Sequence, residues 1–170
     1  MPLPSLTLVL GGARSGKSRH AEALTTARPA PWLYLATAQA LDAEMHTRIA
    51  EHRARRPAGW QTEEVPLDLA SALARAPEDR PLLVDCLTLW LSNHLMAGED
   101  PAAATSALLA VLAAPRGPWV LVSNETGLGI VPENALARRV RAAQGILNQQ
   151  VAALADSVIL TVAGIPLKVK

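Results

Sequence analysis

The chain has 170 residues, of which 50% are hydrophobic and 3% aromatic, and its 16 Lys and Arg residues nearly balance 15 Asp and Glu residues. This length predicts one domain, residues 1–170, with an aliphatic core. A net charge of +1 indicates no nucleic-acid partner, and the single cysteine, Cys86, excludes an internal disulfide framework. We expect a cytoplasmic protein, because no apolar run approaches the roughly 20 residues that span a bilayer and residues 1–4 do not resemble a signal peptide.

The first informative segment is an apolar run, residues 6–10, followed by the octapeptide 11–18. The octapeptide fits the pattern G-x-x-x-x-G-K-[ST] at every fixed position. In this pattern the glycines let backbone N–H groups point at phosphates, Lys17 reaches the β- and γ-phosphates, and the Ser18 hydroxyl binds Mg²⁺. A helical pattern follows over residues 18–28, so we expect an exposed phosphate loop between a strand and a helix. Its nucleotide-binding residues are Gly11, Gly12, Ala13, Arg14, Ser15, Gly16, Lys17 and Ser18.

Further along the chain, apolar runs alternate with helical patterns. The apolar runs predict strands at residues 32–37, 81–86, 119–124 and 157–162, with a short terminal strand at 167–170, and residues 60–65 have mixed strand character. The helical patterns cover residues 42–55, 67–74, 87–96, 101–113 and 133–155. Strands that alternate with helices predict an α/β fold, with a mostly parallel sheet and flanking helices.

Polar side chains stand at the ends of several predicted strands. Ligands of such sheets bind beyond the carboxyl ends of the strands, so these residues should share one site. The segment 37–39 ends the second strand, Asp85 ends the strand of residues 81–86, and 123–125 ends the strand after it. Asp85 stands where a phosphate-loop protein carries an acidic partner for magnesium. The alternative for Asp85 is an ordinary strand-end cap, and for Glu125 a solvated strand end.

A basic segment around His52 is the second candidate for chemistry. Arg48, His52 and Arg56 are spaced i, i+4 and i+8, so they share one face if the helix continues that far. Neighbouring guanidinium groups disfavour a protonated imidazole, and a neutral imidazole can attack phosphorus. The alternative is a solvated basic face that carries a surface histidine, and the local sequence alone favours it. His46 lies six positions before His52, which places it nearly on the opposite face.

Taken together, these segments resemble the bifunctional adenosylcobinamide kinase / adenosylcobinamide-phosphate guanylyltransferase family of cobalamin biosynthesis. The resemblance covers nearly the whole chain, and its most specific stretch is Asn-Glu-Thr-Gly-Leu-Gly-Ile-Val-Pro-Glu-Asn at residues 124–134. The other matching segments are 11–22, 34–38, 42–45, 48–49 with His52 and 56–57, 136–138, 148–149, 164–165 and 168–170.

The resemblance implies a RecA-like P-loop NTPase fold and two reactions. First, ATP or GTP phosphorylates the aminopropanol hydroxyl of adenosylcobinamide. Second, a histidine takes GMP from GTP, releases pyrophosphate and passes the GMP to adenosylcobinamide phosphate, giving adenosylcobinamide-GDP. His52 matches the guanylylated position and His46 does not, so the resemblance reverses the preference for a surface histidine at position 52. We expect Lys17 to be the second catalytic residue.

The resemblance also implies nucleotide contacts outside the phosphate loop. They are Ala36, Thr37 and Ala38 at a strand end, Arg53, Ala54, Arg55 and Arg56 after the nucleophile, and the acidic residues Glu64 and Asp85. Mg²⁺ is expected at Ser18 and Asp85. The chain departs from the family at Ala38, where a serine is common, and no base for the kinase step is assigned beyond the candidate Glu125. The family also implies a homotrimer with sites near subunit interfaces.

Two other functions use the same phosphate loop. A nucleotide-binding switch or assembly module needs the loop but not His52. A plain small-molecule kinase transfers a γ-phosphate from ATP and forms no covalent nucleotide on the protein.

Overall fold

The computed structural model describes residues 5–40 and 43–170, apart from the side chains of residues 44, 48 and 55. Seven strands in this part of the chain form one sheet in the order β3-β2-β4-β5-β1-β6-β7. They are β1 (Leu6–Gly11), β2 (Trp32–Ala36), β3 (Trp60–Glu64), β4 (Leu82–Asp85), β5 (Trp119–Asn124), β6 (Ser157–Val162) and β7 (Ile165–Lys168). Every pairing from β3 to β6 is parallel, and β7 alone runs antiparallel, to β6. The prediction of a mostly parallel α/β sheet is therefore confirmed.

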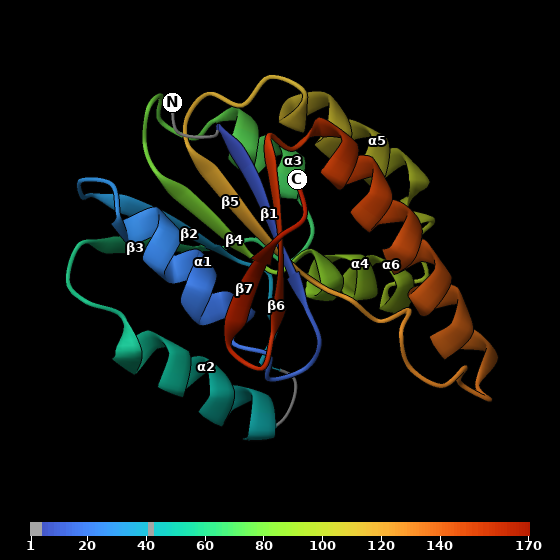
Figure 1. Cartoon of the computed structure of the whole chain (residues 1–170). Helices are drawn as coiled ribbons and strands as arrows, with labels where there is room; N and C mark the ends of the chain where they lie inside the picture. Colours follow the sequence, from blue (N-terminus) through green and yellow to red (C-terminus); the bar gives the residue numbers. More distant parts are fainter. Residues whose placement is uncertain (1–4, 41–42) are drawn as a thin grey trace.

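Helices cover both sides of the sheet (Figure 1). On one side lie α1 (Lys17–Thr26) and α2 (Ala43–Arg55), and on the other side α3 (Leu69–Ala74), α4 (Leu87–Met96), α5 (Pro101–Leu112) and α6 (Ala135–Leu154). Burial on both faces explains why the central strands read as continuous apolar runs rather than as alternating patterns. Within β1, Leu6 and Leu8 pack into the larger core on the α3–α6 side, and Val9 packs with Ala21 of α1.

Capping side chains set where three of the helices begin. Asp68 accepts a hydrogen bond from the backbone N–H of Ser71 at α3, and Asp100 accepts one from Ala102 at α5. Asn134 accepts one from the N–H of Ala137, so α6 begins at Ala135 instead of the predicted residue 133.

The last strand begins earlier than predicted. A tight turn with φ of 51° at Ala163 and 81° at Gly164 reverses the chain directly after β6. As a result β7 occupies residues 165–168 and not 167–170. In the described part of the chain, no helix is long and apolar enough to cross a membrane.

Candidate active site

The phosphate loop connects β1 to α1 at the carboxyl edge of the sheet. Gly16 adopts φ of 92° just before α1, a left-handed conformation that favours glycine. A Cβ atom at Gly11 would lie 2.3 Å from Ser15 Oγ and 2.8 Å from the backbone oxygen of Thr161, so this close approach requires glycine. The prediction of an exposed loop is wrong for two side chains. Ser15 and Lys17 are both buried, and the Lys17 ammonium donates to the Gly12 carbonyl oxygen at 2.9 Å.

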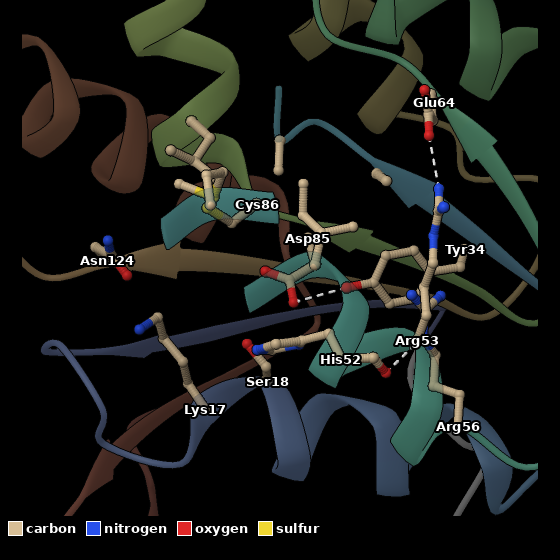
Figure 2. Close-up of a pocket in the computed structure, with 15 residues that line it drawn as sticks. Lys17, Ser18, Tyr34, His52, Arg53, Arg56, Glu64, Asp85, Cys86 and Asn124 are labelled. Carbon is tan, nitrogen blue, oxygen red and sulfur yellow. Dashed lines mark hydrogen bonds and ion pairs between the residues drawn. The ribbon is translucent and has the colours of Figure 1, made fainter. Parts of the chain in front are cut away.

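The loop forms one wall of a cavity of about 150 Å³, which we call the inner cavity (Figure 2). Figure 2 shows Lys17 and Ser18 facing Asp85 on the opposite wall. Nine residues expected at the nucleotide site line this cavity: Lys17, Ser18, Ala36, Ala38, His52, Arg53, Arg56, Glu64 and Asp85. They come from α1, from the ends of β2, β3 and β4, and from α2 and the residues that follow it. The structure therefore brings together groups that lie up to 68 positions apart in the sequence, from Lys17 to Asp85.

A second cavity of about 770 Å³, the outer cavity, also borders the loop. It is lined by Arg14, Ser15, Gly16, Lys17, Ser18, Arg19, Thr47, Glu51, His52, Ala163 and Gly164. Lys17, Ser18 and His52 line both cavities. The His52 side chain thus stands at the boundary between them, while His46 on the same helix is exposed and lines neither.

Tyr34 links two of the expected residues across the inner cavity. Its hydroxyl donates to Asp85 Oδ2 at 2.9 Å, and the Arg56 guanidinium lies 3.7 Å from the centre of its ring. Burial, followed by the negative charge of Asp85, raises the pKa of Tyr34, so its hydroxyl remains a proton donor at neutral pH. Burial also raises the pKa of the neighbouring Cys86 thiol to about 11. Cys86 therefore has little thiolate character at neutral pH, and we assign it no nucleophilic role.

The basic segment after His52 is organised by specific partners. Arg53 forms an ion pair with Glu64 at 2.6 Å, at the end of β3. Arg56 donates through Nε to the backbone oxygen of His52 at 3.2 Å and through Nη1 to Thr62 at 3.1 Å. These bonds fix the C-terminal end of α2 against β3. The side chains of Arg48 and Arg55 lie outside the described part of the structure.

Several expected nucleotide contacts do not line either cavity. Thr37 is fully buried, and its hydroxyl donates to the backbone oxygen of Cys86 at 2.7 Å and accepts from its N–H at 2.8 Å. This hydroxyl holds the ends of β2 and β4 together. Ala54 is exposed on α2. Gly11, Gly12 and Ala13 contribute backbone to the loop but line neither cavity.

Asn124, which belongs to the polar strand end 123–125 expected at this edge of the sheet, lines the inner cavity. It ends β5, next to Gly11 of β1 in the parallel register. Its backbone N–H donates to Thr88 Oγ1 at 2.8 Å, and its backbone oxygen accepts from Asn148 Nδ2 at 3.0 Å. Its side-chain Oδ1 is buried and has no hydrogen-bond partner among the described residues. The polar residues 123–125 at the end of this strand are the sequence feature that predicted a position at the site. The lining residues that were not expected from the sequence are Tyr34, Met45, Ile49, Cys86 and Leu89.

The donor atoms in the inner cavity suit a magnesium ion bound together with a nucleotide. Ser18 and Asp85 offer oxygen ligands there, beside the Lys17 ammonium. The described residues contain no group of three or more His, Cys, Asp or Glu side chains that could hold a metal alone. Mg²⁺ is commonly bound through one or two protein oxygens plus phosphates and water, so the residues present fit this ion.

A mostly parallel sheet with a phosphate loop at its carboxyl edge defines a P-loop nucleotide-binding protein. Solved structures of the same fold include an ATPase from the type III secretion system of pathogenic bacteria, with a TM-score of 0.53 and 14% identity, covering 92% of this chain and 50% of that one. A protein studied under Project ID PH0250 from Pyrococcus horikoshii OT3 has a TM-score of 0.51 and 8% identity, covering 98% of this chain and 86% of that one. These likenesses support the fold alone.

The chain belongs to the cobinamide kinase / cobinamide phosphate guanyltransferase family, whose model matches residues 7–169. It is 53% identical to the bifunctional adenosylcobalamin biosynthesis protein CobP of Pseudomonas aeruginosa, over 96% of each chain. It is 47% identical to the corresponding protein CobU of Salmonella typhimurium, over 97% of this chain and 99% of that one. The CobU of Escherichia coli is 41% identical over the same shares. The family resemblance stated from the sequence is thereby confirmed.

Proposed function

We propose that this chain phosphorylates the hydroxyl of adenosylcobinamide with ATP or GTP and then transfers GMP from GTP to the resulting phosphate, with His52 as the covalent carrier. The observation that carries the proposal is the position of His52, whose side chain lines both cavities together with Lys17 and Ser18. A triphosphate on the loop is thus within reach of an imidazole. Family membership supplies the substrate class.

In the guanylyl transfer, a neutral ring nitrogen of His52 attacks the α-phosphorus of GTP with its lone pair. The bond from that phosphorus to the oxygen bridging to the β-phosphate breaks, and pyrophosphate leaves with the electron pair. The N–H groups of the loop and of the α1 N-terminus, with Lys17, stabilise the charge of the departing group. An oxygen of the acceptor phosphate then attacks the same phosphorus, and the electron pair of the P–N bond returns to the ring.

In the kinase step, the acceptor hydroxyl attacks the γ-phosphorus and the nucleoside diphosphate leaves. Ser18 and Asp85 would hold Mg²⁺, which neutralises charge on the β- and γ-phosphates when bound. Tyr34 orients the Asp85 carboxylate through its hydrogen bond. We place the hydroxyl proton on Glu125, the carboxylate that directly follows Asn124 and accepts from the Gly127 N–H at 2.7 Å.

The test is covalent labelling with GTP that carries ³²P at the α-phosphorus. We expect acid-labile, alkali-stable label on the wild-type protein, none on His52→Ala, and wild-type label on His46→Ala. His46 is the matched control, because it lies on α2 but lines neither cavity. Turnover of cobinamide without label would point to a plain kinase, and neither label nor turnover to a binding module. Label that persists in His52→Ala would disprove the assignment of the nucleophile.

The proposal extends to the whole chain through the family resemblance. Residues 1–170 then act as one catalytic domain, in a homotrimer located in the cytoplasm. Sedimentation equilibrium of the purified protein tests the trimer, since a monomer would contradict it.

A further inference from the structure

We propose that an apolar groove between α4, the segment 126–132 and α6 binds the ring face of the corrinoid acceptor. This inference rests on the proposed function, since it names where the body of the substrate lies while its tail reaches the nucleotide. We call the groove the acceptor groove. It has a volume of about 440 Å³ and is lined by Ser92, Leu95, Met96, Thr126, Ile130, Pro132, Asn134, Leu136, Ala137, Val140 and Arg141.

Large apolar side chains around the acceptor groove are unusually exposed. Ile130 is 97% exposed and Leu128, on the same segment, is 86% exposed. Val131, Leu136 and Met96 are also exposed. Of these, Met96, Ile130 and Leu136 line the groove, and large apolar side chains exposed around a groove are typical of a site that binds a ligand or a partner.

Two arginines of α6 hold the segment in this conformation. Arg141 donates to the backbone oxygens of Gly127 and Gly129, and Arg138 donates to those of Pro132 and Glu133. Arg141 thus binds two carbonyl groups of the segment, and Arg138 binds its last carbonyl group and that of the residue after it. The exposed apolar side chains therefore stand on a fixed backbone, and a surface formed before binding loses little conformational entropy when its ligand arrives.

Two elements lead from the inner cavity directly into the acceptor groove. On α4, Leu89 lines the inner cavity and Ser92, about one helical turn later, lines the groove. At the end of β5, Asn124 lines the inner cavity and Thr126 lines the groove. The groove therefore begins two to three residues further along each of these two elements than the inner cavity does.

The lining residues and sizes of the three cavities favour the acceptor groove, and not the inner or outer cavity, as the binding site of the corrinoid. The inner cavity, at about 150 Å³, is too small to hold a macrocycle beside a nucleotide. The outer cavity is lined by charged side chains, among them Arg14, Arg19 and Glu51, and these suit phosphates better than a ring. A corrinoid has a large apolar ring with amide groups at its edge. The groove offers an apolar floor and the Thr126 hydroxyl, which is buried with no hydrogen-bond partner among the described residues.

The experiment compares Ile130→Ser with Ile146→Ser. Ile146 is a matched control, because it is 57% exposed on α6 and does not line the groove. Binding of dicyanocobinamide is measured by equilibrium dialysis, and the KM for cobinamide in the kinase assay is measured alongside. We expect Ile130→Ser to weaken binding and raise the KM about tenfold, as the loss of one buried aliphatic side chain implies. Ile146→Ser should match the wild type in both measurements.

Self-guanylylation with labelled GTP separates this inference from the proposed function. It needs no acceptor, so Ile130→Ser should label as the wild type does. If the wild-type protein takes no label, the proposed function fails. The equilibrium dialysis still tests whether the groove binds the corrinoid, because it needs no guanylyl transfer. Equal dicyanocobinamide binding by Ile130→Ser and the wild type would overturn the inference. So would a change of oligomeric state in Ile130→Ser by light scattering, which would make the groove an interface between copies of the chain.

Discussion

At the scale of single residues, Tyr34 carries two contacts that can be separated by mutation. Its hydroxyl donates to Asp85, and its ring lies under the Arg56 guanidinium. Tyr34→Phe keeps the ring and removes the donor, which leaves a part-buried carboxylate less well oriented. We expect the unfolding free energy to fall by about 1–2 kcal/mol, and the Mg²⁺ concentration for half-maximal kinase activity to rise about tenfold, as for other residues that orient a metal ligand. Urea denaturation and a Mg²⁺ titration measure the two effects.

Tyr34→Leu is the companion variant, because it also removes the cation–π contact with Arg56. That contact contributes about 0.5–2 kcal/mol, so Tyr34→Leu should be less stable than Tyr34→Phe. The role given to Tyr34 is refuted if Tyr34→Phe needs no more Mg²⁺ than the wild type.

At the scale of the elements, the connection from β1 to α1 distinguishes two neighbouring glycines. A methyl group at Gly11 would meet Ser15 Oγ and the backbone of β6, whereas a Cβ at Gly12 has nothing within 4 Å. We expect Gly11→Ala to lower the unfolding free energy by about 1–3 kcal/mol, the usual cost of overpacking. Gly12→Ala should stay within about 0.5 kcal/mol of the wild type, as changes without packing conflicts do. Equal urea midpoints for the two variants would show that the close approach at Gly11 does not exist.

The same elements show what the sequence could predict. The phosphate loop is a local pattern with a fixed spacing, so the sequence could predict phosphate and Mg²⁺ contacts at Lys17 and Ser18 directly. Strands and helices followed from apolar runs, and capping residues then moved some boundaries. The partners of Tyr34 lie 51 positions away at Asp85 and 22 positions away at Arg56, and no local pattern encodes such contacts. Thr37 lines neither cavity, because its hydroxyl forms hydrogen bonds inside the sheet, and its predicted contact with the nucleotide stays a prediction.

At the scale of the whole molecule, the two cavities meet at residues from distant parts of the chain. The loop at the start of α1, the α2 helix and the turn after β6 all line the outer cavity. The Gly164 N–H also donates to the Ser15 backbone oxygen at 2.8 Å. The turn that carries β7 therefore supports the phosphate loop, and a ligand that binds this loop should stabilise the whole fold and not one segment alone.

Lys17→Ala tests that coupling. A ligand at 100 times its Kd stabilises the folded state by about 2.7 kcal/mol, which corresponds to a rise in Tm of about 5–11 °C for a chain of this size. We expect wild-type protein to show this rise with GTP and Mg²⁺, and Lys17→Ala to lose most of it at the same GTP concentration, because the charge-assisted bonds to the phosphates are gone. Without GTP, the Tm of Lys17→Ala should fall by only a few degrees, since one hydrogen bond to Gly12 is lost. Lys168→Ala, an exposed lysine on β7, should keep the full rise. An undiminished rise in Lys17→Ala would mean that GTP binds elsewhere than the phosphate loop.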